Sequence, residues 1–127
     1  MRMETPIARV RGLGSAHAGA HHWWLERLTS VSTFLLGIWF LVSVLTLPSL
    51  DYATVTEWLS QPLAAVPMIL FVISCFWHSR LGLQVVADDY IHESSRFGIT
   101  LANGFLNVAL AALAIFSILK IAFGGAA

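Results

Sequence analysis

The chain has 127 residues, of which 57% are hydrophobic and 11% are charged, and its mean hydropathy is +0.77. Soluble domains carry about 25% charged residues, so this composition is typical of an integral membrane protein. Seven Lys or Arg balance seven Asp or Glu, which excludes nucleic acid as a partner because phosphate binding requires a basic surface. The single cysteine, Cys75, excludes an internal disulfide and a thiolate zinc cluster.

The first 22 residues are predicted to form a cytoplasmic arm. They contain glycines and show no helical period, so we expect irregular structure. They also lack the apolar core of about 7–15 residues found in a secretory signal, so we expect the arm to be retained. Trp23 and Trp24 follow, at the position of an interfacial aromatic belt, and precede a first apolar run of about residues 28–47. That length suits one crossing of a hydrocarbon core about 30 Å thick.

Two further apolar runs follow, at about residues 63–87 and 99–123. The segment between the first and second runs, residues 48–61, is predicted to be a short loop. The second run contains three polar side chains, His78, Arg80 and Gln84. We therefore predict an all-α integral membrane protein whose residues 23–127 form a three-helix transmembrane anchor.

The positions of the arginines predict how the chain is oriented across the membrane. The arm and its border hold four, Arg2, Arg9, Arg11 and Arg27. The first loop has no Lys or Arg and the second has Arg96, so the positive-inside tendency places the N-terminus and the second loop in the cytoplasm. A bacterial inner membrane fits this pattern best. Three helices make a poor independent bundle, and small residues offer close approach to other helices, which predicts a larger helical assembly.

His78 is the main candidate for cofactor binding. On a helix at about 100° per residue it falls near one line with Gly82, Val85 and Asp89. Gly82 would leave a flat gap beside the imidazole, which a haem macrocycle requires, and neutral imidazole is a common axial ligand of haem iron. His78 also lies about 15 Å from Asp88 along the helix, towards the middle of the bilayer. An inter-helix hydrogen bond explains a lone intramembrane histidine equally well.

Three other residues are candidates near the cytoplasmic boundary. Tyr90 can donate a hydrogen bond to a quinone carbonyl, and Asp89 can orient a cation or relay a proton. Arg27 can hold a carboxylate such as a haem propionate by two hydrogen bonds. The alternatives are an interfacial anchor for Tyr90 and an orientation-setting charge for Arg27. Arg80 points about 200° away from His78 and has no assigned partner.

The spacing H-x10-D-Y, from His78 to Asp89 and Tyr90, together with H-x5-R from His21 to Arg27, resembles the membrane anchor of succinate:quinone oxidoreductase, which is also called succinate dehydrogenase or respiratory complex II. The resemblance extends over roughly residues 12 to 124.

This resemblance implies a role for each matching residue. His78 matches one axial ligand of a haem b whose other ligand comes from a companion cytochrome b-type subunit. Tyr90 matches the tyrosine that hydrogen-bonds ubiquinone, Asp89 its acidic neighbour, and Arg27 an arginine near the haem propionates. An iron–sulfur subunit and a flavoprotein subunit are the implied cytoplasmic partners, so the chain would be a non-catalytic part of an oxidoreductase that transfers electrons from succinate to quinone.

Two alternatives to this function remain open at the level of sequence. A fumarate reductase anchor would run the reaction in reverse. A cofactor-free membrane subunit would use His78, Arg80 and Asp89 as a proton or ion path.

Overall fold

The structure is a computed structural model that describes residues 5–12, 19–90 and 94–124. Within these ranges the chain forms five helices, α1 (Pro6–Arg11), α2 (Gly19–Thr46), α3 (Tyr52–Ser60), α4 (Pro62–Tyr90) and α5 (Ser94–Gly124). Parts of the predicted arm, and the connection at residues 91–93, lie outside the described residues. The short α1 differs from the irregular arm that the sequence led us to expect.

Three of the helices are long and apolar enough to cross a membrane, namely α2, residues Pro62–Ala87 of α4 and residues Phe97–Gly124 of α5. The predicted all-α class and the three predicted spans are therefore confirmed, and the chain is a multi-pass membrane protein. The helices extend beyond the apolar runs, and α2 begins at Gly19 rather than near residue 28. An apolar run marks only the part of a helix that meets hydrocarbon, because polar helical residues continue into the headgroup region.

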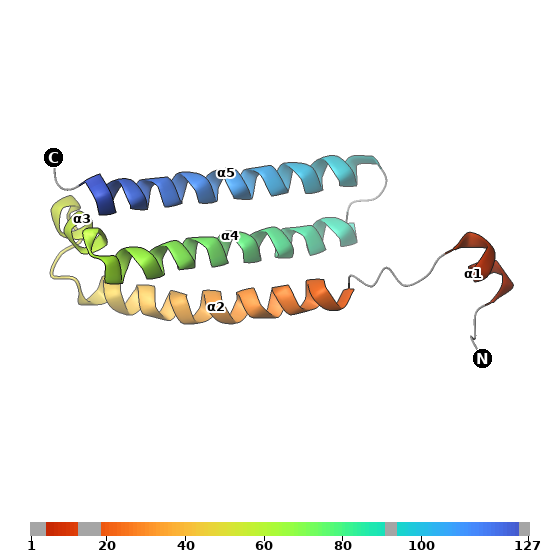
Figure 1. Ribbon diagram of the computed structural model, residues 1–127, viewed down its shortest axis with the longest axis horizontal. Coiled ribbons are helices and arrows are strands. Elements are labelled where there is room, and N and C mark those ends of the chain that lie inside the picture. The colour runs from red at the N-terminus through yellow and green to blue at the C-terminus, as the bar shows by residue number, and fades with distance from the viewer. Residues whose placement is uncertain (1–4, 13–18, 91–93, 125–127) are drawn as a thin grey trace.

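The three long helices lie side by side in one row, with α4 in the middle (Figure 1). Among the described residues α4 contacts both α2 and α5, whereas α2 and α5 are not in contact with each other. At one end of the row α2 and α5 begin and α4 ends at Tyr90 (the Tyr90 end). The other end carries α3 (the α3 end).

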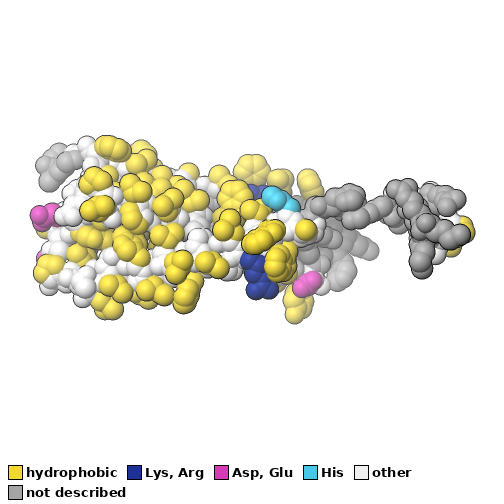
Figure 2. All heavy atoms as spheres, turned by 60° about the horizontal axis from the view of Figure 1, so that its bottom comes forward, with side chains coloured by type: hydrophobic (Ala, Val, Ile, Leu, Met, Phe, Trp, Pro, Cys, Tyr) yellow, Lys and Arg dark blue, Asp and Glu magenta, His cyan; other side chains and the backbone are white. Residues whose placement is uncertain are grey.

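A row of helices leaves large apolar surfaces uncovered. Figure 2 shows hydrophobic side chains over the length of the row, with acidic side chains at the α3 end and Lys or Arg, His and acidic side chains towards the Tyr90 end. No residue of α2 is buried. Lipid and further helices are the surroundings that suit such a surface.

The segment predicted as a loop contains α3. Asp51 caps this helix by accepting a hydrogen bond from the Thr54 backbone N–H at 2.8 Å, and it accepts another from the Ser49 hydroxyl at 2.6 Å. These hydrogen bonds, that from Ser49 foremost, stabilise the carboxylate and lower the pKa of Asp51. The cap therefore remains ionised over the whole neutral range.

A small core at the α3 end holds α3 in place. Leu59 of α3, Ala65 of α4 and Ile118 of α5 are buried together. Trp58 packs beside them and stacks on Trp39 of α2, with ring centroids 6.1 Å apart. The helix is thus joined to all three spans and closes one end of the row.

Candidate functional site

The contact between α2 and α4 changes from apolar to polar along its length. Towards the α3 end, Phe71 of α4 packs near Gly37 and stacks on Phe40, with ring centroids 5.5 Å apart. Towards the Tyr90 end the contact is made by five hydrogen-bonding side chains, which we call the polar seam: Thr29, Ser32, Thr33, Ser74 and His78. Inside a bilayer these hydroxyl and imidazole groups have no water to bond, so they bond one another. The polar seam thereby fixes which faces of α2 and α4 meet.

Ser74 is the centre of the polar seam and is only 7% exposed. Its hydroxyl is hydrogen-bonded to the hydroxyls of Ser32 and of Thr33, the latter at 2.9 Å. It also donates to the backbone carbonyl of Thr29 at 3.3 Å. One α4 side chain therefore contacts two successive turns of α2.

His78 lies one turn beyond Ser74 and is half-buried. Its Nδ1 is 3.1 Å from the Thr29 hydroxyl. Its Nε2 forms no hydrogen bond within the described chain, and no buried side-chain nitrogen of the described residues lacks a partner. Nε2 must therefore reach the surface of the row, where a group from outside the chain can meet it.

The surroundings of His78 fit a haem as regards both donor and space. A Cβ added at Gly82, one turn further along α4, would meet nothing within 4 Å, so the room predicted there is open. The described residues contain no group of three or more His, Cys, Asp or Glu that could hold a metal ion. His78 is therefore the residue of this region that offers a single imidazole nitrogen, the donor that haem iron commonly binds.

Arg80 faces the other neighbour, α5. Its guanidinium lies against Gly104, where an added Cβ would be 3.7 Å from Nε. Its backbone carbonyl accepts a hydrogen bond at 3.1 Å from Asn103, whose own side-chain oxygen accepts one at 2.7 Å from Asn107. Helical phase correctly predicted that Arg80 and His78 diverge, and the structure supplies the contact that the sequence did not.

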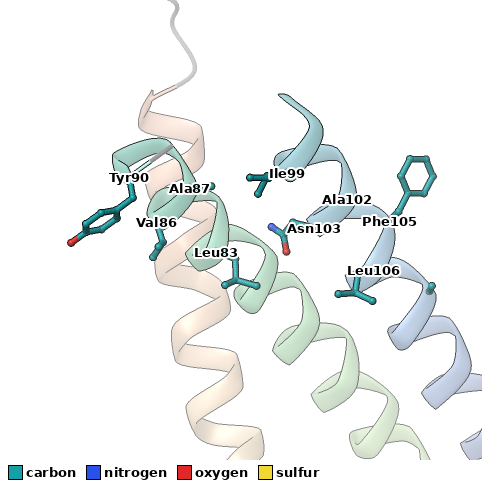
Figure 3. A pocket seen from close by; sticks show the side chains of 10 residues that line it. Leu83, Val86, Ala87, Tyr90, Ile99, Ala102, Asn103, Phe105 and Leu106 are labelled. Carbon is teal, nitrogen blue, oxygen red and sulfur yellow. The ribbon is translucent and has the colours of Figure 1, made fainter. Parts of the chain in front are cut away.

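Tyr90 is 81% exposed and lies at one end of a groove between α4 and α5, with its ring directed away from α5 (Figure 3). The groove has a volume of about 820 Å³ and is almost wholly apolar, with Leu83, Ala87, Ile99 and Leu106 among its lining residues. Asp89 is exposed and does not line it. The groove is therefore an open, apolar surface hollow, and the hydroxyl of Tyr90 points away from it (Figure 3).

Arg27 lies apart from both features. Its guanidinium sits over the Trp23 ring, 5.4 Å from the centroid, and Trp23 in turn packs edge-on against Trp24. It leaves α2 about 200° round the helix from Thr29, the residue that faces His78. Within this chain Arg27 therefore packs on the tryptophan pair near the start of α2.

The structure thus brings His78 and the open space at Gly82 together. It places Tyr90 about 18 Å further along α4, and Arg27 on another face of α2. The α2 half of the polar seam was not predicted from the sequence. The available signal was the spacing of Thr29, Ser32 and Thr33 at three and four residues within an apolar run, which places hydroxyls on one helix face.

Fold and site together define a multi-pass helical membrane subunit with one histidine available to an external group. Residues 1–119 match the family described as succinate dehydrogenase/fumarate reductase transmembrane subunit, and the chain belongs to this family.

Several relatives are named succinate dehydrogenase hydrophobic membrane anchor subunit. The protein from Rickettsia bellii is 33% identical over 91% of this chain and 85% of its own length. The protein from Rickettsia conorii is 34% identical over 67% of this chain and 68% of its own length. The protein from Paracoccus denitrificans is 27% identical over 98% of this chain and 96% of its own length. No solved structure matches the chain.

Proposed function

We propose that the chain is the membrane anchor of a succinate:ubiquinone oxidoreductase, that His78 supplies one axial ligand to a haem b shared with a companion cytochrome b-type subunit, and that Tyr90 contributes to the ubiquinone-reduction site. The names of its relatives favour succinate oxidation over fumarate reduction. An iron–sulfur subunit and a flavoprotein subunit would carry the succinate chemistry on the cytoplasmic side.

The observation that carries the haem proposal is the state of the His78 ring. One nitrogen is held by Thr29 and the other is free at the surface, well inside the membrane span. An unpaired imidazole nitrogen at such depth is costly unless a ligand or a partner meets it. A cofactor-free ion path is less well supported, since Arg80 faces α5 while His78 faces α2.

The bound haem would accept and release single electrons, and the chain's own residues would hold it and keep water away. His78 would fix its position between this chain and the companion subunit. Apolar surface along the α2–α4 contact, including Phe40 and Phe71, would exclude water from the α3 side. Arg27 packs on Trp23, and Asp89 lies about 16 Å from His78 along α4, so a role for either at the haem would be completed by partner subunits.

Tyr90 would act at the quinone head group. Its exposed hydroxyl can donate one hydrogen bond to a carbonyl oxygen, and Asp89 beside it can supply a proton from the aqueous side. The positive-inside pattern supports a cytoplasmic position for this end of the row in a bacterial cell, where it would face the peripheral subunits.

The haem proposal is tested by His78→Ala in the assembled complex. Wild type should show a b-type haem absorbance that the variant loses, whereas Gln84→Ala, a polar change on the same helix, should retain it. Full haem content with an unchanged spectrum in His78→Ala would refute the ligand assignment.

The quinone proposal is tested by Tyr90→Phe. Removing one hydrogen bond should lower quinone reduction roughly two- to tenfold, while succinate oxidation with an artificial acceptor is unchanged. The other tyrosine, Tyr52, lies at the α3 end, so Tyr52→Phe is the matched control. An equal loss of both activities in Tyr90→Phe would contradict the assignment.

A further inference from the structure

We infer that Thr29 is a positioning residue that fixes the tautomer and ring orientation of His78, so that Nε2 is unprotonated and directed out of the row. The inference rests on the proposed haem ligation and adds to it a residue on α2 that controls the ligand.

The Thr29 hydroxyl has a single hydrogen to donate. Three atoms lie within hydrogen-bonding distance of its Oγ1: the carbonyl oxygens of Leu25 at 2.8 Å and Glu26 at 3.1 Å, and Nδ1 of His78 at 3.1 Å. Carbonyl oxygens only accept, and the shortest of the three distances is to the Leu25 carbonyl, so a hydrogen directed at the helix's own backbone satisfies this group best. Back-bonding of this kind is a common arrangement for threonine within a helix.

The state of His78 follows from that assignment. With its hydrogen committed to α2's own backbone, Thr29 can offer His78 only a lone pair, so Nδ1 must carry the proton and donate it. In a neutral imidazole the other nitrogen is then unprotonated. The opposite tautomer would turn the Thr29 hydrogen towards Nδ1 and leave Oγ1 facing both carbonyl oxygens with no hydrogen directed at either.

Thr29 is itself held in place by α4. Its backbone carbonyl lies 3.3 Å from the Ser74 hydroxyl of α4 and 3.1 Å from the Ser32 hydroxyl of its own helix, and these two hydroxyls also bond each other, so one hydrogen of the pair serves the carbonyl and the other joins the pair. Ser74 and His78 are one turn apart on the same face of α4, so Thr29 is bound at two points, through its backbone and through its side chain. The imidazole therefore cannot turn about its own axis without breaking a contact that the polar seam supports.

This arrangement also sets the electron-donating strength of the ligand. A metal-ligating histidine that donates its second N–H to an oxygen is a more basic ligand, and it favours the oxidised metal. Loss of the Thr29 oxygen should therefore make the haem midpoint potential more positive and weaken haem binding by about tenfold or more.

The experiment uses the whole complex in mild detergent and compares Thr29→Val, which keeps the shape and removes the hydroxyl, with Thr29→Ser, which keeps the hydroxyl. Thr33→Val is the matched control, because Thr33 bonds Ser74 but does not touch His78. The readouts are haem per complex, the absorbance spectrum and the haem midpoint potential. We expect a positive shift of the potential and lower haem retention in Thr29→Val, and values like wild type in Thr29→Ser and Thr33→Val.

The possible outcomes separate this inference from the proposed function. If His78→Ala loses haem but Thr29→Val has the wild-type potential, the positioning role is wrong and the ligand assignment stands. Equal shifts in Thr29→Val and Thr33→Val would show general loosening of the seam and would also overturn it. If His78→Ala keeps its haem, the proposed function itself fails. Should Thr29→Val not assemble, Thr29→Ala measured against Thr29→Ser makes the same comparison.

Discussion

Replacing Ser74 by alanine tests whether the polar seam holds α2 to α4. Hydrogen bonds between membrane helices contribute about 0.6 kcal/mol each on average and up to about 1.7. Ser74 has three partners, but the Thr29 carbonyl would still be bonded by Ser32 at 3.1 Å, whereas the Thr33 hydroxyl would lose its hydrogen bond to α4. The expected loss is therefore about 1–2 kcal/mol rather than the full sum of three strong bonds.

The assay is unfolding of the purified complex in a denaturing detergent, followed by loss of helicity. Ser117→Ala is the control, since that hydroxyl bonds the carbonyl of Leu113 in its own helix, at 2.8 Å. Ser74→Ala combined with Thr33→Val should be less destabilising than the sum of the two single changes, because both remove the same bond. A Ser74→Ala effect no larger than that of Ser117→Ala, or strict additivity of the pair, would refute the reasoning.

Three further predictions concern other parts of the chain. Gly82→Leu should cause a several-fold loss of haem from the complex, whereas Gly98→Leu should not. A Cβ at either position would meet nothing within 4 Å in the chain, and haem content measures both variants. Asp51→Ala should lower the melting temperature at neutral pH. Folding lowers the pKa of this carboxyl below its ordinary 3.8, so its stabilisation is present above that pH and is lost as the pH falls through the folded pKa. The difference in melting temperature between variant and wild type should therefore disappear in acid. Gly104→Ala should be tolerated, since its Cβ would make ordinary contact with Arg80, while Gly104→Phe should displace the guanidinium and destabilise the α4–α5 contact; thermal unfolding of both variants decides this.

Much of the fold could be predicted from hydropathy, because crossing a membrane imposes a length and a composition that are visible in one sequence. The exception is α3, where the sequence predicts a loop. Its nine residues are too short for a span, and they are helical because Asp51 caps their start and Leu59 packs into a core supplied by α4 and α5. Neither contact can be seen before the spans are placed side by side.

The candidate site was only partly predictable for a related reason. Helical phase relates residues on one helix, so it correctly grouped His78 with Gly82 and separated Arg80 from both. It cannot say which residues of another helix face them. Thr29 and Gly104 acquire their importance only from the pairing of α4 with its two neighbours.

The order of helices in the row has a consequence for synthesis in the membrane. Each span packs against the span that precedes it in the chain, and α5 never needs to find α2. Before α4 arrives, the α2 hydroxyls of Thr29 and Ser32 can already bond carbonyls of their own helix, so α2 can enter lipid alone without leaving these polar groups unsatisfied. The row can therefore be built in the order of translation, and its open faces are available to partner subunits while the chain is still being made.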